Sequence, residues 1–462
     1  MRGLPVSEER WMARRTGKAA ALVAVLYVSL AHAAAAGEFR FILEGEAGVR
    51  DDGNYGDRGN LDPDQEQILR SNESVGRAGL NLQLSYALQR LNLALAYAPS
   101  YERSLGDADI SGTTHRLDFG LVGDLTRRLR LDVRERLLST PDLNLYAPVA
   151  VPDTTTVSRR GDQLSHALDV TLDHDFSRRA SLVLGVNHSL RKFEDEDLFD
   201  SESLGARIGA GFDLEQGRRL EALAGIGQFD YRERGDADVR TVGIAWVHDL
   251  GRSNHLRVEG GAFWVESSER LLLVLPGEPG NPSDPGEPGV PVVTERIAQE
   301  DRQGWRGALQ FSQEREIIRW GLGLSHDISP GAGLGRAVEA DNAFLGLSVP
   351  VGRQWELGLD GNASRQSDLS SDRDGGEELP GRGDRLTEFA AGTARAAWTF
   401  APAFRLEGGY SQVWQRSEIE SFGNLSYARY FLSLAFRIYS TGETPKAPES
   451  LGRPTDDEPD DQ

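Results

Sequence analysis

The sequence predicts an all-β protein, a transmembrane up-and-down antiparallel β-barrel of about 18 strands. Three observations predict this class. A basic, then apolar, then small-residue segment opens the chain, which is typical of export. Apolar and polar side chains then alternate along most of the remaining sequence. Finally, the connections between these stretches are short and long in turn along the chain.

The composition limits the alternatives. The chain has 462 residues, with 51 basic and 72 acidic side chains and a formal charge of −21. This acidic balance argues against a nucleic-acid partner, which would require a basic face. No apolar run of about 20 residues follows the N-terminal segment, which excludes a polytopic helical transporter. The absence of cysteine excludes disulfides, thiolate metal sites and a cysteine nucleophile.

Residues 1–36 are predicted to form a cleaved signal peptide. Five basic residues precede an apolar run at 19–30, and alanines then lead to Gly37. Cleavage after Ala33 and cleavage after Ala36 both fit the small-residue rule. The alternative is a single membrane anchor, but the apolar run is short for a span and lacks a stop-transfer flank.

The first predicted strand covers residues 38–50. Phe39, Phe41, Leu43, Ala47 and Val49 share one parity, and charged residues fill the other. Because successive side chains of a strand point to opposite faces, this strand has one apolar and one charged face. The pattern recurs near residues 80–86, 91–97, 117–121, 129–133, 164–172, 182–190, 204–212, 220–231, 242–246, 256–264, 305–311, 318–324, 345–349, 355–359, 394–400, 404–410 and 430–438. The parity of 220–231 is ambiguous.

The connections favour a membrane barrel, predicted to span residues 37–438. Short turns are expected on the periplasmic side and long loops on the extracellular side. The long loops are expected near 51–73, 102–112, 140–161, 192–202, 232–238, 267–302, 328–337, 364–385 and 415–422. A soluble β-sandwich or propeller would show shorter strands, and a β-solenoid would show a fixed repeat.

Aromatic residues and the C-terminal end support the same orientation. Two interfacial girdles are indicated, although strands also favour aromatic residues in general. The girdles would comprise Trp320, Trp355, Trp398 and Phe404 beside short turns, and Tyr97, Tyr101, Trp264 and Trp414 toward long loops. The segment 430–436 is similar to the terminal assembly signal of outer-membrane barrels. The acidic tail at 439–462 is predicted to be disordered in the periplasm.

The polar parity should face the barrel interior, which for about 18 strands is too wide for side chains to fill. Its candidate lumen-lining residues are Arg116, Arg130, Arg134, Arg207, Arg257, Arg306, Arg319, Arg395, Arg405 and Arg429. These arginines could together guide an anionic polymer. Alternatively, each could pair with a carboxylate on a neighbouring strand and simply stabilise the wall.

Loop 267–302 contains Gly/Pro triplets that predict a stiff polyproline-like segment, acting either as a lid or as an exposed hairpin extension. No GxSxG, HExxH or P-loop pattern occurs. His166, His174 and His188 share the lipid-facing parity. We therefore expect no catalytic residue, no metal site and no cofactor, and the chain is not expected to be an enzyme.

With this architecture, the chain resembles the β-barrel porins of exopolysaccharide and capsule export clusters, such as the alginate exporter and Wzp-type barrels. The resemblance covers residues 38–438 at the level of pattern and includes no diagnostic motif. It implies a passive conduit in the outer membrane of a Gram-negative bacterium, working with outer-membrane lipid, a polysaccharide and periplasmic export proteins. A diffusion porin, and less readily an outer-membrane enzyme or adhesin, are the alternatives.

Overall fold

The computed structural model describes residues 38–54, 73–106, 111–142, 160–194, 199–215, 217–232, 234–251, 253–275, 292–315, 317–329, 337–368, 386–417 and 425–439. The predicted signal peptide, residues 1–36, lies outside them. So does the predicted acidic tail at 439–462, apart from Tyr439. Among the described residues, no helix is long and apolar enough to cross a membrane.

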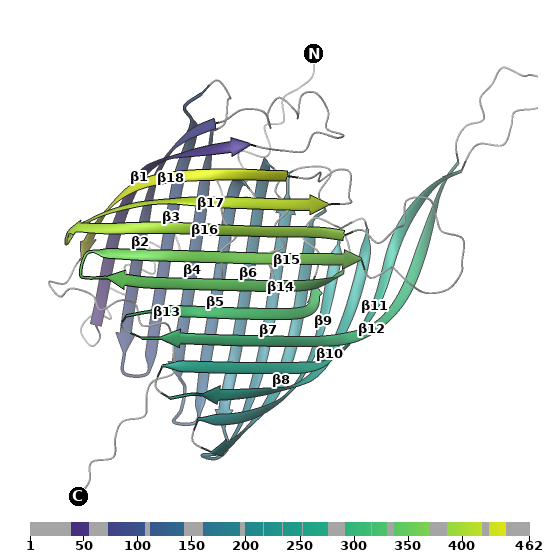
Figure 1. Cartoon of the computed structure of the whole chain (residues 1–462). Coiled ribbons are helices and arrows are strands. Elements are labelled where there is room, and N and C mark those ends of the chain that lie inside the picture. Colours follow the sequence, from purple (N-terminus) through teal and green to yellow (C-terminus); the bar gives the residue numbers. More distant parts are fainter. Residues whose placement is uncertain are drawn as a thin grey trace, which may run out of the picture.

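The described part of the chain forms one closed antiparallel sheet of 18 strands (Figure 1), as the alternation predicted. The strands are β1 (Glu38–Asn54), β2 (Glu73–Leu88), β3 (Leu91–Ser104), β4 (Ser111–Asp124), β5 (Leu129–Asp142), β6 (Arg160–Asp175), β7 (Ala180–Phe193), β8 (Ser201–Glu215), β9 (Arg218–Tyr231), β10 (Gly235–Asp249), β11 (Asn254–Leu275), β12 (Val292–Glu314), β13 (Arg319–Ser329), β14 (Val338–Val351), β15 (Trp355–Asp368), β16 (Leu386–Ala401), β17 (Phe404–Ser417) and β18 (Leu425–Tyr439).

Each strand pairs with the next along the chain, and β1 also pairs with β18. This last pairing closes the barrel, so that no strand edge is left at the seam. Closure matters because hydrocarbon cannot hydrogen-bond to an open sheet edge. At the seam, Arg437 Nη2 donates to Glu44 Oε1 at 3.0 Å and joins the last strand to the first.

The two ends of the barrel differ in their connections. Two to four residues join β2 to β3, β4 to β5, and each later even-numbered strand to the next, at what we call the short-turn end. Longer segments connect the strands at the opposite, long-loop end. The exception is the connection from β9 to β10, because β10 begins at Gly235, inside the loop predicted at 232–238. At the short-turn end, Gly352 adopts φ +69° between β14 and β15, a conformation that favours glycine.

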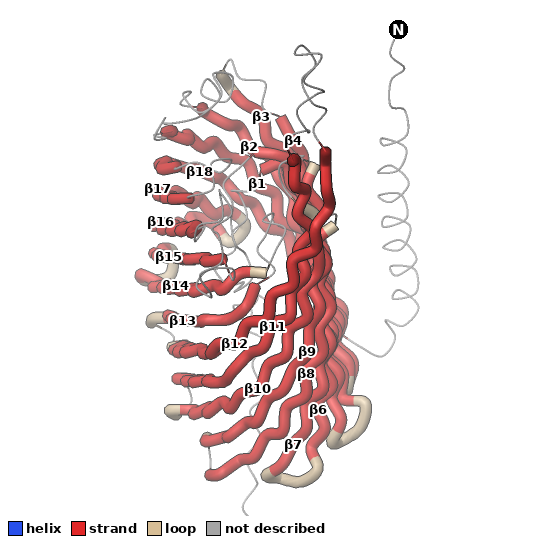
Figure 2. The backbone as a smooth tube through the Cα atoms, turned by 90° about the vertical axis from the view of Figure 1, so that its right-hand side faces the viewer, coloured by secondary structure: helices blue, strands red, loops and turns tan. Residues whose placement is uncertain are grey.

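The loop predicted at 267–302 is partly wrong. β11 continues to Leu275 and β12 begins at Val292, and they pair from Asn254 with Gln313 up to Leu275 with Val292. β10 pairs with β11 only as far as Glu269. The two longest strands therefore form a two-stranded arm beyond their neighbours (Figures 1 and 2). Backbone pairing has extended the sheet on both sides of the Gly/Pro-rich residues, which themselves lie outside the described part.

Aromatic rings gather on the outer face near both ends. Toward the short-turn end, Trp355 stacks on Trp398 with ring centroids 5.7 Å apart, and Phe400 stacks on Phe404 at 5.9 Å. Toward the long-loop end, Trp264, Trp305 and Trp414 are exposed. Such rings suit the interface between hydrocarbon and headgroups.

Candidate functional site: the lumen wall

The strand register separates an outer and an inner face. Exposed apolar side chains face each other across strands; Val49 on β1 is 50% exposed and pairs with Leu432 on β18, which is 51% exposed. Because side chains alternate between the faces of a sheet, each such pair fixes the parity of its strands. The register then places all ten candidate arginines on the inner face, opposite to these apolar residues.

A continuous chain of ion pairs crosses the inner face from β8 to β13. Arg257 on β11 is its centre, with Nη1 2.7 Å from Glu221 Oε2 and Nη2 3.1 Å from Glu259 Oε2. Seven charged residues alternate in sign along it, in the order Asp213, Arg219, Glu221, Arg257, Glu259, Arg306 and Asp327. Positive and negative charges therefore balance closely along this part of the wall.

The chain depends on a small residue in β10. Glu221 on β9 and Glu259 on β11 both pair in register with Ala245 on β10. Ala245 has no long side chain to separate them and is only 1% exposed. Arg257 can therefore reach across β10 and contact Glu221 two strands away. A larger inward residue at position 245 would interrupt the chain.

A second network lies on β15, β16 and β17. Arg405 Nη1 lies 3.3 Å from Glu356 Oε2, and its Nη2 lies 3.0 Å from Glu407 Oε2. Arg395 lies between Asp360 and Glu407, with nitrogen–oxygen distances of 3.4 and 3.8 Å. Ser348 also donates to Glu356 at 2.9 Å. This network repeats the arrangement in which one guanidinium is shared by two carboxylates.

Three further candidate arginines have a carboxylate partner on the inner wall. Arg116 contacts Asp118 at 2.6 Å, Arg134 contacts Asp132 at 2.9 Å, and Arg207 contacts Asp169 at 3.5 Å. Within the described ranges, at least seven of the ten candidates thus have a carboxylate within ion-pair distance: Arg116, Arg134, Arg207, Arg257, Arg306, Arg395 and Arg405. For these seven, the structure favours the wall-stabilising interpretation of each individual arginine. Of the other candidates, Arg130 is paired in backbone register with Asp173, Arg319 with Ser348 and Arg429 with Asp52.

The sequence did not single out several members of these networks. Arg219 and Glu221 begin the strand whose parity was ambiguous, so their inward position could not be assigned. Arg136, which contacts Asp118 at 2.8 Å, does share its parity with Arg130 and Arg134. That parity was the available signal for finding it.

Toward the long-loop end, side chains of the inner face are more deeply buried. Arg50 Nη1 contacts Glu102 Oε2 at 2.8 Å, and both side chains are 9% exposed. An apolar cluster formed by Tyr231, Ala237, Val239, Phe263, Val265 and Ala337 is also buried. The most exposed charged networks therefore lie nearer the middle and the short-turn end of the wall.

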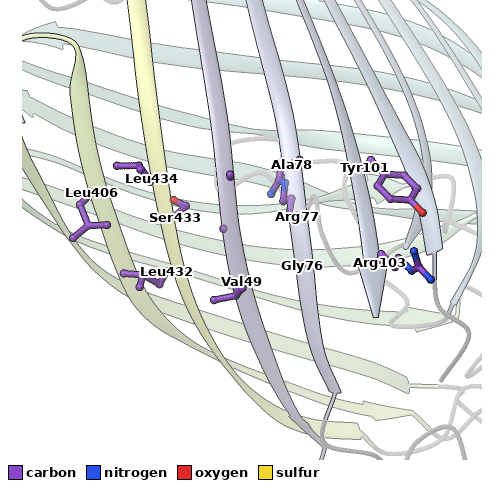
Figure 3. Close-up of a pocket in the computed structure, with 12 residues that line it drawn as sticks. Val49, Gly76, Arg77, Ala78, Tyr101, Arg103, Leu406, Leu432, Ser433 and Leu434 are labelled. Atoms are coloured by element: carbon purple, nitrogen blue, oxygen red, sulfur yellow. The ribbon is translucent and has the colours of Figure 1, made fainter. Parts of the chain in front are cut away.

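The three histidines considered from the sequence lie on the outer face. His166, His174 and His188 all pair in register with exposed-face residues, so they point away from the lumen. No group of three or more histidine, aspartate or glutamate residues that could hold a metal ion occurs in the described ranges. At the seam, small residues on β1 and β2 leave a shallow apolar groove beside Val49 and Leu432 (Figure 3). Its apolar walls suit contact with lipid hydrocarbon.

Comparisons with known proteins give only distant structural similarity. No protein-family model matches the sequence, and no curated protein matches it. The copper transporter OprC is 10% identical with a TM-score of 0.42, covering 83% of this chain and 64% of that chain. This chain therefore spans less than two thirds of that transporter. OccK2 (OpdF) of Pseudomonas aeruginosa, solved with glucuronate, is 12% identical with a TM-score of 0.40, covering 87% of this chain and 98% of its own. OccAB1 of Acinetobacter baumannii is 9% identical with a TM-score of 0.41, covering 87% and 97%.

The architecture of the barrel itself shows the membrane in which the chain resides. Eighteen antiparallel strands close into a barrel with an apolar, aromatic-flanked outer face and a charged inner face. A closed barrel satisfies every strand edge, and its outer apolar face matches hydrocarbon. The chain is an outer-membrane β-barrel.

Proposed function

We propose that this barrel is a passive outer-membrane conduit for exopolysaccharide export. The observation that carries the proposal is the inner wall, in which arginines and carboxylates alternate as connected networks. The charge chain centred on Arg257 and the network around Arg405 both follow this plan. They line separate parts of the barrel circumference, so the lining is collective and no single binding centre dominates it.

A balanced wall suits a hydroxyl-rich polymer for a physical reason. Each guanidinium has five N–H donors, and the ion pairs use only some of them. Hydroxyl groups of a moving chain can exchange hydrogen bonds with such donors and with carboxylate oxygens much as they do with water. Because the arginines of both networks have carboxylate neighbours, an anionic solute would meet no deep electrostatic trap there. The wall therefore favours passage of a neutral or weakly charged polymer over tight capture.

The proposal assigns no catalysis and no cofactor to the barrel. Polymer synthesis and the energy for export would come from periplasmic and inner-membrane partners, because the sequence contains no nucleotide-binding motif. The barrel would supply a route through the membrane and contact lipid with its outer face.

The test is deletion of the gene, with measurement of surface and secreted polysaccharide and of small-solute uptake. We expect polymer to be lost and to be restored by the wild-type gene. A double variant, Arg257→Met with Arg405→Met, should restore it less well because both networks lose their shared cation. Arg365→Met is the matched control, since Arg365 pairs in register with outer-face residues.

Two results would count against export. Unchanged polymer together with altered uptake of small solutes would indicate a diffusion porin. Unchanged polymer and unchanged uptake would remove both conduit functions and favour an enzyme or adhesin. Immunoblotting of outer-membrane fractions must show that every variant is assembled to the wild-type level.

A further inference from the structure

A row of four ionisable side chains crosses the outer face of β5 to β8. Glu135, His166, His188 and Glu202 lie on successive strands and all share the outward parity. His166 Nε2 lies 3.1 Å from Glu135 Oε1, and His188 Nε2 lies 3.0 Å from Glu202 Oε1. The two imidazole rings are neighbours, with centroids 5.6 Å apart and planes tilted by 54°.

This row lies within the apolar surface. Glu202 is the second residue of β8, at the long-loop end, whereas Glu135 is midway along β5. Glu135, His166 and His188 lie deeper in the membrane than Glu202, and the next outward residue on either side of each is apolar. These neighbours are Val133 and Leu137 on β5, Leu164 and Leu168 on β6, and Val186 and Leu190 on β7. Hydrocarbon alone is a poor environment for such groups, and ionisable residues at membrane depth commonly mark a function.

The hydrogen bonds match a recurrent feature of metal centres. A metal-ligating histidine usually donates its second ring N–H to a carboxylate, which orients the ring and raises the basicity of the ligating nitrogen. Both histidines have such a carboxylate at Nε2, and no contact of Nδ1 is described for either within the residues that the structure covers. Nδ1 is therefore the nitrogen available to a ligand.

The spacing of the rings also fits. With zinc–nitrogen distances near 2.0 Å and tetrahedral angles, two imidazole centroids around one ion lie roughly 5 Å apart. The observed 5.6 Å differs by an amount that small side-chain rotations can absorb. By contrast, His326, which is also on the outer face, has a carboxylate partner in Asp341 at 2.7 Å but stacks on Trp305 at 4.0 Å. It has the carboxylate without the second imidazole.

We propose that His166 and His188 bind a divalent transition-metal ion such as Zn²⁺ on the outer face of the barrel. Glu135 and Glu202 are positioning residues that orient the two imidazoles. Two nitrogen ligands do not fill a tetrahedral shell, so the remaining ligands come from outside this chain. They are water in the isolated barrel, or the same two histidines of a second copy.

The experiment uses the full chain without a histidine tag, purified in detergent. Zn²⁺ is titrated by calorimetry, and Co²⁺ is added separately so that its visible absorption reports nitrogen coordination. We expect saturable binding that falls at least tenfold in the His166→Ala, His188→Ala double variant. His326→Ala should bind as the wild type does. Glu135→Gln with Glu202→Gln should weaken binding about 10- to 100-fold.

Light scattering with and without Zn²⁺ identifies the outer ligands. A doubling of the protein mass with one ion per two chains indicates a second copy, and an unchanged mass with one ion per chain indicates water; either result supports the site. The proposal is overturned if the wild type shows no saturable binding, or if the double variant binds as tightly as the wild type. Heat-modifiable migration in gels checks that each variant is folded. Polysaccharide export does not enter this readout, so the two proposals can fail separately.

Discussion

Replacing Arg257 by methionine removes the cation at the centre of the longest charge chain while keeping most of the side-chain volume. Glu221 then keeps only Arg219 as a cationic partner and Glu259 only Arg306, while the two carboxylates are just 17% and 11% exposed. Removing one partner of a buried ion pair costs about 3–5 kcal/mol. Arg257 itself is 26% exposed, so water in the lumen should reduce this cost, and we expect a loss of about 2–3 kcal/mol.

Urea unfolding of the refolded barrel in lipid vesicles, followed by tryptophan fluorescence, measures the loss. Arg134→Met is the matched control, because Arg134 also contacts a carboxylate, Asp132 at 2.9 Å, but its side chain is 61% exposed. An exposed pair of this kind contributes about 0–1 kcal/mol. Equal stability of the Arg257 variant and the wild type would refute the argument that the chain is a cooperative element of the wall.

The same variant also tests whether the chain faces the conducting path. With the cation removed, the chain has four carboxylates and only two arginines, so the lumen should prefer cations more strongly than in the wild type. Reversal potentials across planar bilayers in a salt gradient measure this preference. An unchanged reversal potential, despite a measurable loss of stability, would place these side chains away from the path of the ions.

Three further perturbations have defined outcomes. Alanine substitution of either Trp355 or Trp398 should destabilise the barrel. A double-mutant cycle of unfolding free energies should give a coupling of about 0.5–1.5 kcal/mol for their stacked rings. A coupling near zero would show that the two rings contact lipid independently. Gly352→Val should lower the unfolding free energy by about 1–2 kcal/mol, because a β-branched residue must then adopt φ +69°. The cost is one of backbone conformation alone, since a Cβ at this position meets nothing within 4 Å. Wild-type stability of the variant would show that the turn changes conformation. Glu44→Gln should weaken the contact with Arg437 that joins the first and last strands and lower the refolding yield; an unchanged yield would assign closure to backbone pairing alone.

Much of the fold could be predicted from strand parity, because a lipid-facing surface demands an apolar residue at every second position. β1 and β18 are examples, since Leu43 and Val49 on β1 and Leu432 and Leu434 on β18 share the outward parity. Each strand also has a bulky apolar residue of the inward parity, Ile42 and Phe431. The strand at 220–231 could not be assigned. Its outward face carries Leu220 and Ile226, but its inward face carries Phe229 and Tyr231, which pack in the inner apolar cluster. Both parities are therefore apolar there.

The arm formed by β11 and β12 escaped prediction for another reason. Glycine and proline within 276–291 suggested a loop over the whole of 267–302. Those residues limit only their own backbone, and the flanking stretches remain free to pair. The register from Glu269 with Ala298 to Leu275 with Val292 shows that they do. Composition averaged over a long segment therefore concealed two strand extensions.

Parity predicts the face on which a charged residue lies, but it does not predict its partner. Arg257 contacts Glu221 across an intervening strand, and this requires both the register of β9, β10 and β11 and a small residue at Ala245. None of these follows from a single strand. The same limit applied to His166 and His188, whose outward parity was evident but whose contacts with carboxylates on neighbouring strands were not.

The consequences of pairing differ between the two faces of the sheet. On the inner face, water can solvate whatever an ion pair leaves exposed, so arginine and glutamate can alternate over many strands at a modest energetic cost. On the outer face, hydrocarbon offers no such compensation, and a carboxylate as deep as Glu135 is favourable only with a partner. Its hydrogen bond to His166 supplies one, and a metal ion bound by the two histidines would strengthen it by increasing the positive character of each ring N–H. Charge on the inner wall therefore needs no added ligand, whereas the proposed metal ion would stabilise the row on β5 to β8 in surroundings where water cannot.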